Sequence, residues 1–119
     1  MKILCIDDNK EITALLEQIL TTEKHEFTAS DNGKEGLELM RQSNFDVILL
    51  DISMPNFSGL DLIDKISKEG NIAKYNIVIL TATSMDPEKL ENLLKLGVKG
   101  YLEKPVTIND LFSVLKKFE

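Results

Sequence analysis

The stretch VILLDISMP (residues 47–55) decides the fold of this chain. Its first four residues form an uninterrupted apolar run, which is typical of a central strand buried on both faces of a parallel sheet. The run ends at Asp51, whose carboxylate is costly to bury unless a specific partner holds it. Taken alone, such an aspartate caps a turn more often than it serves a site. The residues at the ends of three other predicted strands favour a functional site over a simple turn cap.

Length and composition predict one globular, soluble domain that covers residues 1–119. The hydrophobic content is 43%, and the formal net charge of -6 argues against a nucleic-acid-binding surface. No apolar stretch approaches the roughly 20 residues that cross a bilayer, and the N-terminus lacks a signal-peptide pattern. The single cysteine, Cys5, lies in an apolar segment and reads as a buried structural thiol. We therefore expect a cytoplasmic protein without membrane contact.

Apolar runs alternate with helical patterns along the whole chain. Strands are predicted at 2–6, 27–30, 47–50, 77–80 and 100–102, and helices at about 11–22, 34–42, 60–69, 87–96 and 108–118. This alternation predicts an α/β fold: a doubly wound parallel sheet of five strands, with five helices on its two faces. In the fourth helix, the spacing of Leu90, Leu93, Leu94 and Leu96 predicts mostly core positions.

Polar residues follow four of the five predicted strands. They are Asp7-Asp8, Asp51, Thr81 and Lys104-Pro105. Ligands of open parallel sheets bind beyond the carboxyl ends of the strands, so these side chains should share one cleft. Crowded carboxylates repel one another, and a hard divalent cation such as Mg²⁺ relieves that repulsion. A carboxylate nucleophile beside a metal ion and a lysine suits phosphoryl transfer through an aspartyl phosphate.

Together with Gly59 and Thr81-Ala82, these residues make the whole chain resemble a response-regulator receiver domain of two-component signalling, similar to the chemotaxis regulators. The resemblance implies a flavodoxin-like sheet of strand order 2-1-3-4-5. It also implies that Asp51 accepts a phosphoryl group from the phosphohistidine of a sensor histidine kinase or a histidine phosphotransfer protein. Such a domain promotes its own phosphorylation and dephosphorylation but is not a turnover enzyme.

The resemblance assigns the metal site to the acidic strand ends. Asp8 is implied to bind Mg²⁺, or Mn²⁺ in its place, more directly than Asp7, which acts largely through water. Asp51 and the backbone carbonyl of Ser53 are implied to complete the protein ligands.

The remaining implied roles concern the phosphoryl group and the response to it. Thr81 and Lys104 would contact phosphoryl oxygens, and the Lys104–Pro105 peptide would be cis. Thr81 and Tyr101 would form the switch that alters the face of the fourth helix, fifth strand and fifth helix, where a downstream protein binds. A monomer, or a weak dimer on phosphorylation, is expected. Two positions are implied to modulate phosphoryl lifetime, Ser53 and Thr83.

Other functions fit the residues less well. A phosphohydrolase of the haloacid-dehalogenase type would need an aspartate two residues after its nucleophile, where this chain has Ser53. A flavodoxin-like flavin carrier would not place Asp7 and Asp8 against the flavin phosphate. A pseudo-receiver that only binds partners remains a third alternative. We expect a stand-alone signalling module, with a receiver fragment of a longer regulator as the alternative.

Overall fold

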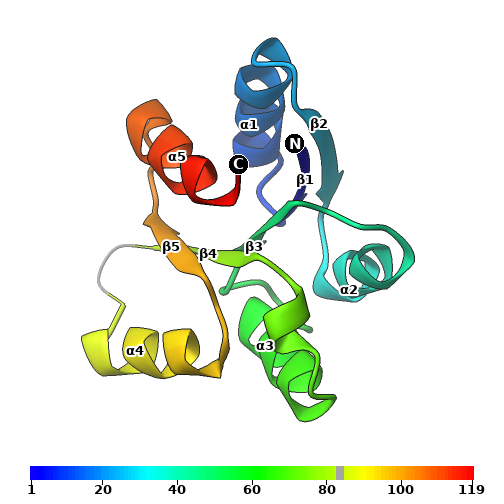
Figure 1. Ribbon diagram of the computed structural model, residues 1–119, viewed down its shortest axis with the longest axis vertical. Coiled ribbons are helices and arrows are strands. Elements are labelled where there is room, and N and C mark those ends of the chain that lie inside the picture. The colour runs from blue at the N-terminus through cyan, green and yellow to red at the C-terminus, as the bar shows by residue number, and fades with distance from the viewer. Residues whose placement is uncertain (83–84) are drawn as a thin grey trace.

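The computed structural model describes residues 1–82 and 85–119 and places them in a five-stranded parallel sheet flanked by helices (Figure 1). The strands are β1 (Lys2–Ile6), β2 (Glu26–Ser30), β3 (Val47–Asp51), β4 (Ile77–Thr81) and β5 (Gly100–Glu103). The helices are α1 (Lys10–Thr22), α2 (Gly33–Gln42), α3 (Gly59–Lys68), α4 (Pro87–Leu96) and α5 (Ile108–Leu115), with 3₁₀ turns η1 (Ile72–Lys74) and η2 (Lys116–Phe118). The strand order is β2-β1-β3-β4-β5, which confirms the predicted flavodoxin-like α/β fold.

The sheet separates two apolar layers, because successive side chains of a strand point to opposite faces. Leu4, Ile48 and Leu50 pack with the apolar sides of α2, α3 and α4. Ile3, Val47 and Leu49 pack with α1 and α5. Figure 1 shows this division of the helices around the sheet. Strand β3 is buried at every residue, as its continuous apolar run predicts.

Local sequence signals fix where the helices begin. The side chain of Asn9 caps α1 by accepting hydrogen bonds from the amides of Glu11 and Ile12. Ser58 and Asp61 form a capping box at the start of α3. The predicted start of α4 is confirmed, because Asp86 caps the helix and Pro87 occupies its first turn. Each helix therefore begins directly after the loop that leaves the carboxyl end of the preceding strand.

One prediction about helix α4 is wrong. Leu93 is buried, but Leu94 and Leu96 are 41% and 46% exposed, so they are not core residues. The reason is that α4 lies at the β4–β5 edge of the sheet, where only one narrow stripe of the helix meets other elements. In the described part of the chain, no helix is long and apolar enough to span a membrane.

Candidate functional site

The carboxyl ends of β1, β3, β4 and β5 meet at one edge of the sheet. Asp7 directly follows β1, Asp51 ends β3 and Thr81 ends β4, while Lys104 directly follows β5. The parallel registers align Ile6 with Leu50, Asp51 with Leu80, and Thr81 with Glu103. Residues that are far apart in the sequence therefore lie side by side beyond the sheet.

Asp7 and Asp51 are held in matching ways by their own loops. Asp7 Oδ1 accepts a hydrogen bond of 2.9 Å from the backbone amide of Asn9. Asp51 Oδ1 accepts one of 3.0 Å from the backbone amide of Ser53. In both cases the amide lies two residues after the aspartate, which fixes the plane of the carboxylate. Each aspartate therefore keeps its second oxygen for other partners.

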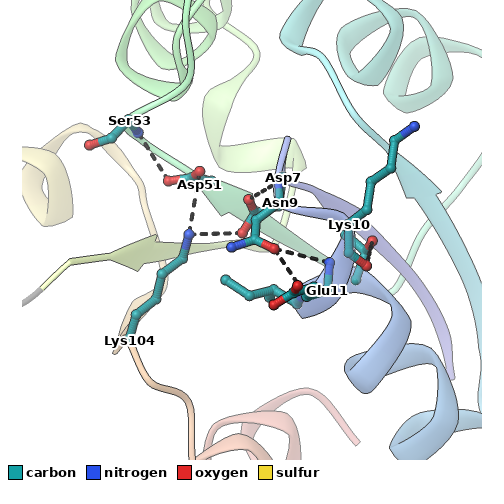
Figure 2. A network of polar contacts seen from close by, with 9 residues as sticks. Asp7, Asn9, Lys10, Glu11, Asp51, Ser53 and Lys104 are labelled. Atoms are coloured by element: carbon teal, nitrogen blue, oxygen red, sulfur yellow. Dashed lines mark hydrogen bonds and ion pairs between the residues drawn. The ribbon is translucent and has the colours of Figure 1, made fainter.

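Those second oxygens both face the ammonium group of Lys104, as Figure 2 shows. Lys104 Nζ lies 2.9 Å from Asp7 Oδ2 and 3.4 Å from Asp51 Oδ2. Asp7 Oδ2 is fully buried and has no hydrogen-bond partner among the residues that the structure describes. The positive charge of Lys104 is therefore the contact that balances this oxygen.

Burial and neighbouring charges shift the pKa values of the central pair. Burial raises the pKa of Asp51 above its usual range and Asp7 adds to that rise, whereas the amide of Ser53 and the charge of Lys104 oppose it. Burial alone would lower the pKa of Lys104, but its contacts with Asp7 and Asp51 outweigh this and the pKa is raised. Lys104 therefore stays protonated at neutral pH and can offset negative charge in the cleft.

Three carboxylates form a set that can hold a metal ion. Oxygen atoms of Asp7, Asp8 and Asp51 all lie within 4.8 Å of one another. Asp7 and Asp51 are buried, while Asp8 is exposed and faces solvent. An all-oxygen set that is open to water on one side fits Mg²⁺, which keeps several waters when it binds proteins.

The two predicted switch residues make no side-chain hydrogen bond to the acidic cluster among the residues that the structure describes. Thr81 is buried, and its hydroxyl donates a hydrogen bond of 2.8 Å to the carbonyl oxygen of Ala82. The Tyr101 side chain is 43% exposed on β5. Thr83 lies outside the described residues. The strands nevertheless connect these positions to the site, because the amide of Lys104 donates to the carbonyl oxygen of Thr81 at 2.8 Å.

Three further residues complete the surroundings of Asp51. Ser53, the second residue after β3, is exposed, and the Lys104–Pro105 peptide bond is cis. Gly59 lies against the end of β3, where an added Cβ would overlap the carbonyl oxygen of Asp51 and Cα of Ile52. Glycine at this position lets the first residue of α3 pack against the backbone at the end of β3.

Sequence reasoning missed the role of Asn9. Its side chain begins α1 and its backbone amide orients Asp7, so one residue sets both the helix and the carboxylate. The signal was present as an asparagine between an aspartate pair and a helical pattern.

Comparison with known proteins gives a consistent family. The family model described as response regulator receiver domain matches residues 3–116. Two-component response regulator ORR11 of Oryza sativa subsp. indica is 30% identical over 97% of this chain and 78% of its own length. The uncharacterized transcriptional regulatory protein YrkP of Bacillus subtilis is 36% identical over 94% of this chain. The chain spans about half the length (46–51%) of three such regulators.

Solved structures agree with these sequence relatives. The receiver domain of the Francisella response regulator 1452 superposes with a TM-score of 0.85 at 31% identity, and the match covers 98% of this chain and 95% of that chain. The Vibrio cholerae chemotaxis protein CheY4 superposes with a TM-score of 0.86 at 26% identity, and the match covers 99% and 98% of the two chains.

Proposed function

This chain belongs to the response regulator receiver domain family, and from that premise we propose that it is a switch controlled by phosphorylation of Asp51. The observation that carries the proposal is the setting of Asp51. One of its oxygens is fixed by the amide of Ser53, and the other faces Lys104 beside the acidic pair of Asp7 and Asp8. We propose that residues 1–119 act as one receiver unit.

The proposed reaction is a transfer between two side chains. A carboxylate oxygen of Asp51 attacks the phosphorus of a phosphohistidine, so a P–O bond forms while the P–N bond breaks and the electron pair returns to the imidazole. The donor would be a sensor histidine kinase or a histidine phosphotransfer protein. Water later hydrolyses the acyl phosphate, so the domain completes a signalling cycle and is not a turnover enzyme.

The residues around Asp51 would manage the charge of that transfer. Mg²⁺ bound by Asp7, Asp8 and Asp51, with the Ser53 carbonyl as a further ligand, would neutralise phosphoryl oxygens. Mn²⁺ would serve in the same set of oxygen ligands. The ammonium group of Lys104 already contacts the carboxylate of Asp51. After the transfer it would contact an oxygen of the phosphoryl group on Asp51. Since Ser53 is exposed next to Asp51, its side chain would affect access of the hydrolytic water, a role also proposed for Thr83.

The switch would start from the side-chain positions described above. The Thr81 hydroxyl bonds only to Ala82 within the described residues, so it is free to turn toward a phosphoryl oxygen. The ring of Tyr101 would then move inward from its exposed position. Such a movement changes the face formed by α4, β5 and α5 and with it the affinity for a downstream protein.

Phosphorylation of Asp51 can be tested directly. Incubation with Mg²⁺ and acetyl phosphate should add one phosphoryl group that hydroxylamine removes, as measured by intact mass. Asp51→Asn should gain none, whereas Asp64→Asn, which alters an exposed residue of α3, should be labelled like the wild type. Equal labelling of Asp51→Asn and the wild type would disprove the proposal.

A further inference from the structure

The side-chain amide of Asn9 has a fixed orientation at the edge of the acidic cleft. Its oxygen Oδ1 accepts hydrogen bonds of 3.0 and 3.3 Å from the backbone amides of Glu11 and Ile12. Because both partners are donors, the atom that faces them is the oxygen, and the nitrogen lies on the other side of Cγ. Asn9 is exposed, and its Nδ2 makes no hydrogen bond among the residues that the structure describes. Asn9 therefore carries an oriented N–H donor that is available to a ligand.

This nitrogen faces the part of the cleft that contains the phosphoacceptor. Since Oδ1 is bound to the start of α1, Nδ2 is turned away from that helix, and Figure 2 shows it on the side where Lys104 and Asp51 lie. The backbone amide of Asn9 also holds Asp7 Oδ1 at 2.9 Å. Asp7 Oδ2 contacts Lys104 Nζ at 2.9 Å, and the same ammonium lies 3.4 Å from Asp51 Oδ2. A continuous chain of polar contacts therefore connects Asn9 to Asp51.

A second asparagine shows that capping a helix does not require a free donor. Asn32 Oδ1 caps α2 by accepting a hydrogen bond of 2.8 Å from the amide of Glu35. Its Nδ2 donates to Asp31 Oδ1 at 3.1 Å, so both ends of this amide have partners within the protein. Asn32 also follows β2, which β1 separates from the strand that carries Asp51. Of these two helix caps, only Asn9 thus offers an open donor beside the cleft.

The chemistry of the cleft gives such a donor a use. A transferring phosphoryl group brings negatively charged oxygens to a place that already holds the carboxylates of Asp7, Asp8 and Asp51. The charge of Lys104 is shared between two of these carboxylates. An amide N–H stabilises a charged oxygen strongly, and a donor that is oriented before the reaction needs no rearrangement when the charge arrives.

We propose that Nδ2 of Asn9 donates a hydrogen bond to an oxygen of the phosphoryl group during its transfer to Asp51 and in the phosphorylated product. This inference rests on the proposed function. The phosphoryl group would extend from Asp51 past Lys104 toward Asp7 and Asn9. Asn9 is then a catalytic residue through its nitrogen, while its oxygen keeps the cap of α1.

The side-chain amide signals in ¹⁵N NMR spectra test this contact on the wild-type chain. With Mg²⁺ present, beryllium trifluoride, which mimics a phosphoryl group on an aspartate, should shift the Nδ2 signals of Asn9 downfield and slow their exchange with water. The signals of Asn32 should stay in place, because its Nδ2 already has a partner. The backbone amide of Asp51 reports that the probe has bound. A response of Asp51 without a response of the Asn9 side chain would overturn the proposal.

Cap-preserving variants separate the donor from the start of the helix. Asn9→Ser keeps an oxygen that can cap α1 but removes Nδ2, so the melting temperature should stay within about 2 °C of the wild type. Its rate of phosphorylation by acetyl phosphate at saturating Mg²⁺ should fall about tenfold. Asn32→Ser makes the same change at α2 and should alter the rate less than about twofold. Equal rates for Asn9→Ser and the wild type would overturn the proposal.

Asn9→Asp adds a test of sign. Aspartate also caps helices well, but it replaces the donor with a carboxylate that repels phosphoryl oxygens, so labelling should be slower than in Asn9→Ser. Labelling as fast as in the wild type would contradict the proposed contact.

Two further outcomes keep the inference apart from metal binding and from the proposed function. Asn9→Ser should bind Mg²⁺ with wild-type affinity, and a loss of affinity as large as the loss of rate would overturn the proposal, because Asn9 would then act through the metal. Failure to label the wild type would defeat the proposed function and this inference with it. Labelling of the wild type and Asn9→Ser at one rate would defeat only the role of Asn9.

Discussion

At the level of single residues, we expect the ionised carboxylate of Asp51 to lower the stability of the fold at neutral pH. Burial raises the pKa of its carboxyl, Asp7 adds to the rise, and Ser53 and Lys104 offset only part of it. The folded protein therefore holds this proton more tightly than the unfolded chain does. The protonated form of Asp51 therefore contributes stability that is complete below the unfolded pKa of about 3.9. This contribution is lost as the pH rises through the raised pKa of Asp51 in the folded protein.

Asp51→Asn should therefore stabilise the protein at pH 7 in the absence of divalent ions. We expect the melting temperature to rise by about 3–5 °C, which corresponds to about 1 kcal/mol for a domain of this size. The gain should vanish at a pH of about 3, where Asp51 is protonated in both states. Mg²⁺ should stabilise the wild type more than the variant and so narrow the difference.

Calorimetry with and without EDTA measures these shifts. Asp64→Asn is the matched control, because Asp64 is exposed and its pair with Lys68 is a surface contact that contributes little. A lower melting temperature for Asp51→Asn at pH 7 would mean that the contact with Lys104 outweighs burial and repulsion from Asp7.

At the level of elements, the junction between β3 and α3 depends on Gly59. A Cβ at this position would overlap two backbone atoms, the carbonyl oxygen of Asp51 and Cα of Ile52, and backbone cannot move aside as a flexible side chain can. Gly59→Ala should therefore lower the free energy of unfolding by about 2 kcal/mol, as measured by urea denaturation.

Gly70→Ala is the control for that prediction. Gly70 is the second residue after α3 and has a φ of +77°. A Cβ added there would meet nothing within 4 Å. Its cost is backbone strain alone, about 1 kcal/mol. If Gly59→Ala cost no more than Gly70→Ala, the β3–α3 contact would not constrain the site.

The sequence was sufficient for elements whose pattern has one explanation. The apolar runs at 47–50 and 77–80 are too short and too continuous for amphipathic helices, and both are buried central strands. Helix α4 was predicted correctly in extent, but Leu94 and Leu96 are exposed. Spacing shows which residues share a side of a helix, and it does not show how much of that side the rest of the fold covers.

The same distinction applies to the site. Strand ends predicted that the carboxylates of Asp7, Asp8 and Asp51 converge, because parallel topology alone requires it. The pairing of Lys104 with both Asp7 and Asp51 depends on side-chain conformations, which the sequence does not encode locally. The exposure of Tyr101 and the hydrogen bond of the Thr81 hydroxyl to Ala82 are likewise side-chain details that the pattern of strands does not predict.

At the level of the whole molecule, the site is built from residues that are distant in the sequence and that only the folded sheet brings together. Asp7 and Asp8 follow β1, Asp51 ends β3 and Lys104 follows β5. A cation bound by the carboxylates would therefore bind the folded chain and not the unfolded one, since the unfolded chain does not bring these groups within reach of one ion. Metal binding should stabilise the entire domain and not only the loops that supply ligands.

Cys5 provides a direct measurement of that coupling. It is fully buried in β1, and burial raises the pKa of its thiol, so the native protein should not react with a thiol reagent until the sheet opens. When the sheet opens and closes much faster than the reagent reacts, Mg²⁺ bound to the folded form should slow the labelling of Cys5. The labelling rate should fall by the factor 1 + [Mg²⁺]/Kd, which is about tenfold at a Mg²⁺ concentration ten times Kd. Asp8→Asn removes an exposed carboxylate that we propose as a metal ligand, and it should abolish this dependence while leaving the rate without metal nearly unchanged. Labelling that is fast in the native protein would show that β1 opens locally, and labelling that ignores Mg²⁺ would show that the acidic cluster does not join the strands through a cation.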